Sequence, residues 1–264
     1  MPFVQIKDVV HHYVIEGPDA APTIVFANSL GTDLRIWDGV LAHLRGRFRI
    51  VRYDKRRHGL TDVTSSPYTI DVLADDLVAL LDILKIDEAV ICGLSIGGMI
   101  AQAFAAAHPQ RVRALVRCDT ATRIGSPKMS DERIAAIQKD GFARMAGEIM
   151  ERWFTRDFRD KRDTELQGYT NMLLRTPVEG YIGACYAFRD ADLSEAARSI
   201  RKPSLVLCGN EDIATPADLV ASLTRIIPGA RFSLIKITAH LPCVEQPEAV
   251  GHIMMQFFEE NGAV

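Results

Sequence analysis

Short apolar runs rich in β-branched residues recur along this chain, and segments with helical periodicity separate them. The opening stretches FVQIKD and HHYVIEG alternate apolar with polar positions and predict a hairpin. In residues 70–84 the leucines keep to one face and acidic residues occupy the other, which predicts an amphipathic helix. Four apolar runs in the first half predict strands, at 23–27, 48–53, 88–93 and 112–118.

Strands that alternate with helices pair in parallel through right-handed crossovers, and helices then cover both faces of the sheet. This rhythm stops after Asp119, and residues 125–189 are helical in pattern, more charged and richer in Met and aromatic residues. Strand patterns resume at 203–209 and 231–237, and a helix over 247–259 closes the chain. The fold class is therefore α/β, with a mostly parallel central sheet flanked by helices.

The change of pattern also predicts the domain organisation. Residues 1–122 and 195–264 are expected to form one core, and residues 123–194 an inserted helical cap. A chain of 264 residues is long enough for this arrangement.

Composition excludes several classes of function. The formal net charge of −3 argues against general affinity for nucleic acid or anionic membranes. Five cysteines without close pair spacing predict neither a disulfide framework nor a zinc site. The N-terminus MPFVQIKDVVHHYV lacks the basic and apolar regions of a secretion signal, so a cytoplasmic location is expected. The sequence leaves the oligomeric state open.

One local excess of positive charge stands out. Seven basic residues fall between positions 45 and 57. The preferred interpretation is a solvated face around a strand, and the alternative is attraction of a small anionic substrate.

The stretch ICGLSIGGMI places a lone serine among glycines in a strongly apolar part of the chain. Ser95 follows a predicted strand and precedes a predicted helix over 96–107, in the pattern G-x-S-x-G. This is the nucleophile elbow in its required strand–turn–helix context. Side chains at Gly93 or Gly97 would collide with backbone in so tight a turn. A glycine-rich packing turn is the alternative without chemistry.

A serine hydroxyl needs a base to take its proton. His240 lies just past the last predicted strand, at the sheet edge where the elbow is expected, and is the predicted base. His58 also lies at this edge, and a role in shaping its loop is preferred. The remaining histidines are assigned to packing or surface positions, namely His11, His12, His43, His108 and His252.

The base in turn needs an acid that fixes its tautomer and stabilises the imidazolium. Asp212, which follows the strand at 203–208, is the first choice, Asp119 the second and Glu211 the third. The chain order Ser95, Asp212, His240 is the one expected for this architecture.

Two backbone N–H groups are expected to form an oxyanion hole, those of Ile96 and Leu30. Leu30 lies in the loop Asn28-Ser29-Leu30-Gly31 after a predicted strand, and a plain turn is the alternative for this loop. Chemistry of this kind requires neither metal nor organic cofactor.

At this point the sequence resembles the α/β-hydrolase superfamily, and more narrowly the 3-oxoadipate enol-lactonases. The resemblance is carried by FANSLGTDLRIWD, RYDKRRHGLTD, CGLSIGGMIAQ, CDTATRIG, ERWFT, FRDADL and AHLPCVEQPE. It implies an α/β-hydrolase fold and a carboxylic-ester hydrolase that opens a small anionic lactone to 3-oxoadipate in the bacterial breakdown of aromatic compounds. The same resemblance implies a Ser-His-Asp triad acting through an acyl-enzyme.

The sequence departs from the family pattern at two places. Arg57 stands where a glycine is expected, and Ser130 stands where the family usually has a tryptophan three residues before an arginine. Another carboxylesterase or lactonase of the same fold is therefore an open alternative, and a non-catalytic ligand-binding relative is a third. The substrate carboxylate asks for a cation near the pocket, and the candidates are Arg133, Arg152 and Arg189. The candidates for an apolar wall over the lactone are Trp153 and Phe154.

Overall fold

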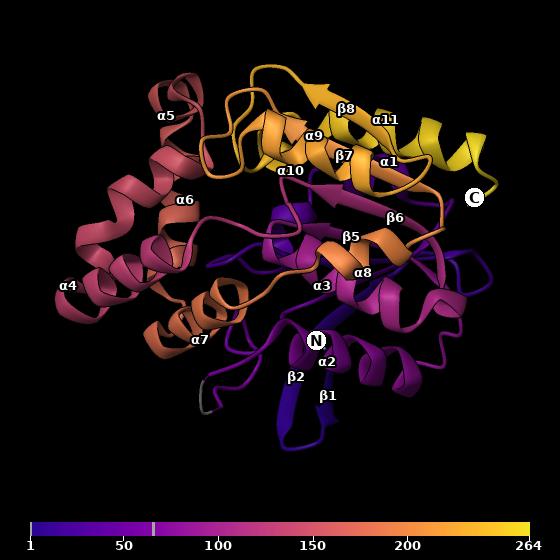
Figure 1. The fold of residues 1–264 in the computed structure, drawn as a ribbon, viewed down its shortest axis with the longest axis horizontal. Coiled ribbons are helices and arrows are strands. Elements are labelled where there is room, and N and C mark those ends of the chain that lie inside the picture. The colour runs from indigo at the N-terminus through magenta and orange to yellow at the C-terminus, as the bar shows by residue number, and fades with distance from the viewer. Residues whose placement is uncertain (1, 65–66) are drawn as a thin grey trace.

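The computed structural model describes residues 2–64 and 67–264, and its eight strands form one sheet in the order β1-β2-β4-β3-β5-β6-β7-β8 (Figure 1). The first three strands in this order pair antiparallel, and all later neighbours pair in parallel. The strands are β1 Phe3–Ile6, β2 Val9–Glu16, β3 Thr23–Ala27, β4 Arg49–Tyr53, β5 Ala89–Leu94, β6 Val112–Cys118, β7 Ser204–Gly209 and β8 Arg231–Ile235.

Every strand predicted from the apolar runs is present, with ends shifted by no more than two residues. β3, β5 and β7 are buried at every position, as expected for strands that helices cover on both faces. β8, at the edge of the sheet, is only partly buried. The predicted α/β class and α/β-hydrolase fold are confirmed.

Helices flank the sheet on both faces (Figure 1). α3 packs against α2 and α8, α8 packs against α9, and α1 packs against α11. These helices are α1 Leu41–Leu44, α2 Ile70–Ile83, α3 Ile96–Ala107, α8 Ser194–Ser199, α9 Ala217–Ile226 and α11 Pro247–Glu260. Short helices complete the core, namely η1 Leu34–Trp37, η2 Pro109–Arg111 and α10 Pro242–Glu245.

Four helices between β6 and β7 gather at one end of the molecule, at the left of Figure 1. They are α4 Pro127–Trp153, α5 Arg156–Lys161, α6 Asp163–Leu174 and α7 Val178–Arg189. α4 is interrupted at Gly141, whose φ of 70° breaks the helical backbone. All four fall within the segment 123–194 predicted as a cap, and the division into core and cap stays a prediction.

The long apolar run 89–107 divides into β5, a turn at Ser95 and α3. Among the residues that the model describes, none of the helices combines the length and the apolar character needed to cross a bilayer.

The interpretation of the basic run 45–57 as a solvated face is wrong for its last four members. These side chains are buried, namely Arg52, Lys55, Arg56 and Arg57. Arg56 donates to both carboxylate oxygens of Asp76 inside the fold. The more exposed arginines pair with acids, Arg45 with Glu16, Arg47 with Glu259 and Arg49 with Asp19. Polar contacts within the structure, rather than hydration, account for the buried cations.

Arg117 is the most unusual charge in the core. It lies in β6 between Gly93 of β5 and Val206 of β7 and has no exposed surface. None of its guanidinium nitrogens has a hydrogen-bond partner among the described residues. Burial lowers the pKa of Arg117 to about 9. An unpaired charge in such a place destabilises the folded state.

We expect Arg117→Met to raise the free energy of unfolding by about 1–4 kcal/mol, because methionine keeps an unbranched stem and removes the buried charge. Urea unfolding measures the change. Arg113→Met is the matched control on the same strand, since Arg113 is partly exposed and pairs with Glu88 at 3.2 Å. Its effect should stay within about 0.5 kcal/mol. A destabilised Arg117→Met protein would contradict the interpretation.

Candidate active site

The turn between β5 and α3 is built by close backbone approaches. A Cβ at Gly93 would lie 2.1 Å from the carbonyl oxygen of Gly97, and a Cβ at Gly97 would lie 2.2 Å from the carbonyl oxygen of Ala27. Only glycine fits either place. Ser95, between them, has φ 57° and ψ −118°, a backbone conformation that residues other than glycine rarely adopt.

Hydrogen bonds hold Ser95 in this conformation. Its N–H donates to the carbonyl of Cys118 at 2.9 Å, and its own carbonyl accepts from the Thr120 hydroxyl at 2.7 Å. The elbow is thereby tied to the end of β6. The local geometry is that of a nucleophile elbow, as the sequence predicts.

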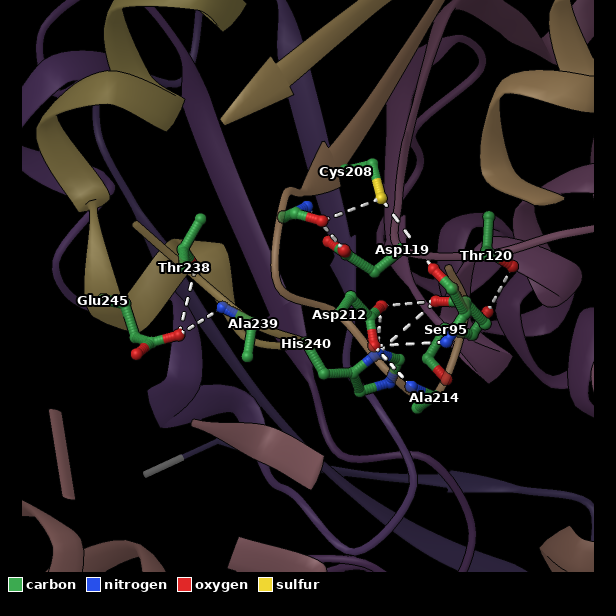
Figure 2. A network of polar contacts seen from close by, with 12 residues as sticks. Ser95, Asp119, Thr120, Cys208, Asp212, Ala214, Thr238, Ala239, His240 and Glu245 are labelled. Atoms are coloured by element: carbon green, nitrogen blue, oxygen red, sulfur yellow. Dashed lines mark hydrogen bonds and ion pairs between the residues drawn. The ribbon is translucent and has the colours of Figure 1, made fainter. Parts of the chain in front are cut away.

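His240 and Asp212 lie beside the elbow, where Figure 2 shows their side chains meeting. His240 Nδ1 is 2.8 Å from Asp212 Oδ2. The other carboxylate oxygen accepts from the N–H groups of Ala214 and Thr215, at 2.7 and 3.1 Å. Burial tends to raise the pKa of Asp212, but His240 and the hydrogen bonds from Thr215 outweigh it and lower the pKa. Asp212 therefore stays ionised and accepts the Nδ1–H, so in the neutral ring Nε2 carries no proton.

Asp119, the second choice for the acid, lies close to Asp212 rather than to the imidazole (Figure 2). Its side chain is fully buried and accepts from the N–H of Gly209 at 2.8 Å. Burial and the neighbouring Asp212 charge raise the pKa of Asp119 well above its usual value. Cys208 lies close enough for the three residues to share an ion, but burial also raises the pKa of its thiol. Both pKa shifts favour the protonated forms, which are poor metal ligands.

Ser95 and His240 line one cavity, as do Leu30 and Ile96, so the structure brings all the predicted residues except Asp212 to its wall. Asp212 lies behind His240 as the partner of its ring. Within the described residues the structure records no hydrogen bond between Ser95 Oγ and His240. Such contacts are often long before substrate binds. Glu211, the third choice for the acid, is neither among the ring's hydrogen-bond partners nor in the cavity wall.

The two residues predicted to supply the oxyanion donors line the cavity that contains Ser95. Among the described residues, no intramolecular acceptor is recorded for the N–H of Leu30 or of Ile96. The next N–H in the loop, that of Gly31, donates to His58 Nε2 at 3.1 Å, and His58 Nδ1 lies 2.9 Å from the carbonyl of Arg56. Burial and the charge of Lys55 hold the pKa of His58 well below its ordinary value. His58 therefore shapes this loop as a neutral ring, as the sequence analysis prefers.

Glu245 is a site residue that sequence reasoning missed. One carboxylate oxygen accepts from the N–H of Ala239 at 2.6 Å, next to His240, and from the hydroxyl of Thr238 at 3.1 Å (Figure 2). The other oxygen accepts from the N–H and hydroxyl of Thr155, at 2.9 and 2.7 Å. The histidine loop is therefore fastened to the segment that follows α4. Burial was the missing information, because glutamate in a sequence usually indicates a solvated position.

The far wall of the cavity comes from α4 and α7 and carries two cations. Arg133 and Arg152 line it, and neither pairs with a carboxylate among the described residues. Arg189, by contrast, pairs with Asp131 and Asp190 and is not in this wall.

The aromatic candidates also separate. Trp153 lines the cavity, whereas Phe154 is buried and stacks on Phe158 with ring centroids 4.2 Å apart. The two departures from the family pattern, Ser130 and Arg57, both lie where the core loops meet α4 and α7. Ser130 is buried in the cavity wall, and Arg57 has φ 60° and lies 3.5 Å from Glu179 of α7.

Comparison with known proteins places the chain among enzymes of this architecture. A family model described as the alpha/beta hydrolase fold matches residues 22–247. The chain is 34% identical to 3-oxoadipate enol-lactonase 1 and 31% identical to 3-oxoadipate enol-lactonase 2 of Acinetobacter baylyi, with 92% and 93% of this chain and 91% and 92% of the relatives covered. The crystal structure of the enol-lactonase from Burkholderia xenovorans LB400 superposes with a TM-score of 0.95 at 36% identity, covering 98% of this chain and all of that one.

The choice between the two acids is open to experiment. We expect Asp212→Asn to slow the labelling of Ser95 by a fluorophosphonate about ten-thousand-fold, because the amide no longer fixes the imidazole tautomer. Asp119→Asn should slow labelling less than about tenfold, because the imidazole is bonded to Asp212 and the amide nearly keeps the shape of the carboxyl. Mass spectrometry of the labelled protein measures both rates. A greater loss in Asp119→Asn would reverse the assignment.

Proposed function

The chain belongs to the α/β-hydrolase fold family, and we propose that it hydrolyses 3-oxoadipate enol-lactone to 3-oxoadipate through an acyl-enzyme on Ser95. The observation that carries this proposal is the 2.8 Å Asp212–His240 hydrogen bond beside an elbow serine in a shared cavity. The names of the relatives at 31–36% identity support the substrate. The reaction would be one step in the breakdown of aromatic compounds.

In the proposed mechanism Ser95 Oγ attacks the lactone carbonyl while His240 Nε2 takes its proton. The tetrahedral oxyanion is stabilised by the N–H groups of Leu30 and Ile96. The intermediate collapses by breaking the ring C–O bond, and the enol oxygen takes the proton from His240. The freed enol converts to its ketone, so the ring does not close again. His240 then takes a proton from water, which attacks the ester carbonyl. His240 returns this proton to Ser95 Oγ as the ester C–O bond breaks.

The unpaired cations of the cavity wall support an anionic substrate. Arg133 and Arg152 line the same cavity as Ser95, and neither pairs with a carboxylate among the described residues, so a carboxylate on the lactone would supply that partner. The rest of the wall is mostly apolar, which suits a small ring and limits the access of water.

A second candidate is another lactonase or carboxylesterase of the same fold. Ser130, in the cavity wall where the related enzymes usually have tryptophan, favours it, since a smaller side chain leaves more room for substrate. A panel of lactones and small aryl esters that includes the enol-lactone decides between the two. A rate for the enol-lactone among the lowest in the panel would overturn the first proposal. A non-catalytic relative would fail to react with a fluorophosphonate at Ser95.

The nucleophile is tested directly by Ser95→Ala. We expect this variant to lose turnover of the enol-lactone by about a million-fold while its circular dichroism and unfolding midpoint change little. Rapid quenching followed by mass spectrometry provides a second measurement, because an acyl-enzyme adds the mass of the acyl group to the peptide that contains Ser95. Undiminished turnover by folded Ser95→Ala would remove the serine from the mechanism.

The carboxylate partner is tested by Arg133→Met. We expect KM for the anionic enol-lactone to rise at least about tenfold, because a charge-assisted hydrogen bond is lost. KM for a neutral aryl ester should change less than about twofold. Arg189→Met is the matched control, since Arg189 already pairs with Asp131 and Asp190. Equal rises in KM for both substrates would show that Arg133 shapes the cavity but does not recognise the charge of the substrate.

A further inference from the structure

The peptide group that joins Ser29 to Leu30 has an unusually well-satisfied carbonyl. Its oxygen accepts a hydrogen bond from Lys55 Nζ and another from the Thr32 hydroxyl at 3.0 Å, and the Thr32 N–H lies at 3.4 Å. The N–H of the same peptide belongs to Leu30, which lines the cavity with Ser95 and has no acceptor of its own among the described residues. The Ser29 carbonyl therefore accepts several hydrogen bonds, whereas the Leu30 N–H makes none that is recorded among the described residues.

Lys55 is an expensive residue to bury. Lys55 is only 2% exposed, and no salt bridge to its ammonium group is recorded within the described residues. Burial lowers the pKa of Lys55 to about 7, although the charges of Asp54 and Asp33 oppose the shift. The hydrogen bond that the structure records for the ammonium is the one to Ser29. A group that costs stability and contacts a catalytic loop suggests a role in that loop.

The geometry of the peptide group links the direction of the Ser29 carbonyl to that of the Leu30 N–H. A trans peptide is planar, so a donor that fixes the direction of the carbonyl also fixes the N–H on the opposite side. Hydrogen bonds to the carbonyl draw electron density away from the nitrogen and strengthen its N–H as a donor, and a charged donor does so most. A pre-oriented, polarised N–H is what an oxyanion requires.

We propose that Lys55 is a positioning residue of the oxyanion hole, which holds and polarises the Ser29–Leu30 peptide so that the Leu30 N–H stabilises the tetrahedral intermediate. Thr32 assists through its hydroxyl. The inference rests on the proposed function, since it requires acyl transfer at Ser95. Lys55 touches neither substrate nor reacting atoms and acts through the peptide alone.

Lys55→Met removes the charge and keeps the length of the stem. We expect kcat for an aryl ester to fall about tenfold with KM within about twofold of wild type, which is less than the loss from removing an oxyanion donor outright. Thr32→Val, of nearly equal shape, should lower kcat by about threefold. Lys85→Met is the matched control, because Lys85 is exposed in the turn before β5. Its kcat should equal that of wild type.

A spectroscopic measurement separates polarisation from simple loss of structure. In a cinnamoyl-Ser95 acyl-enzyme carrying a carbon-13 carbonyl, infrared difference spectra report the hydrogen bonds to the ester oxygen. We expect Lys55→Met to move this band to higher wavenumber and Lys85→Met to leave it in place.

The pH profile provides a further readout. The charged and titratable groups recorded as acting with Lys55 are Asp54, Asp33 and His58, and the last of these is held neutral. The loss of positive charge from Lys55 should lower kcat about tenfold as pH rises through about 7. This alkaline decline should be absent in Lys55→Met.

The outcomes separate the two proposals. Undiminished turnover in Ser95→Ala overturns the proposed function and this inference with it. Unchanged kcat, carbonyl band and pH profile in folded Lys55→Met, with Ser95 still required, overturns only the role of Lys55.

Discussion

The contact between the elbow and the end of β3 is the constraint on which the site depends. Gly97 lies so close to the carbonyl of Ala27 that no side chain fits between them. Because β3 and β5 are neighbours in the sheet, this contact also places the loop that begins at Asn28 beside Ser95. Thr120, at the end of β6, closes the turn from the other side through its contacts with Ser95 and Gly98. The bend that exposes the hydroxyl therefore also brings the predicted oxyanion loop to it.

Sheet order extends the same logic to the remaining groups. The strands β3, β5, β6, β7 and β8 are consecutive in space and parallel, so their carboxyl ends lie along one edge. Each end supplies one part of the site: Leu30 after β3, Ser95 after β5, Asp119 after β6, Asp212 after β7 and His240 after β8. This is why the positions of strands in the sequence indicate which residues lie along one edge of the sheet. Apolar runs and glycine spacing are local signals, and the parallel sheet converts them into a site.

The features of the site that the sequence did not reveal are buried charged side chains. Lys55 and Glu245 both belong to residue types that usually lie in water, and nothing local distinguishes them from solvated neighbours. Their partners are backbone groups of other loops, Ser29 for the lysine and Ala239 for the glutamate, which no side-chain pattern encodes. The solvated interpretation of the basic run failed for the same reason. The sequence could only rank the two acids. The hydrogen bond from the imidazole to Asp212 favours Asp212 over Asp119, and the assignment stays a prediction.

The two departures from the family pattern acquire a physical meaning at the boundary between the core loops and the helices over them. Arg57 occupies a backbone conformation suited to glycine, and its Cβ fills the space that a side chain at position 180 would need. Gly180 of α7 thus complements Arg57, while Glu245 fastens the histidine loop to Thr155. The His58 loop and the His240 loop are therefore each packed against a different part of the α4–α7 segment. A change in how those helices sit would move the His58 loop and the His240 loop together. The shape of the substrate cavity and the alignment of the catalytic groups are consequently not independent properties of this chain.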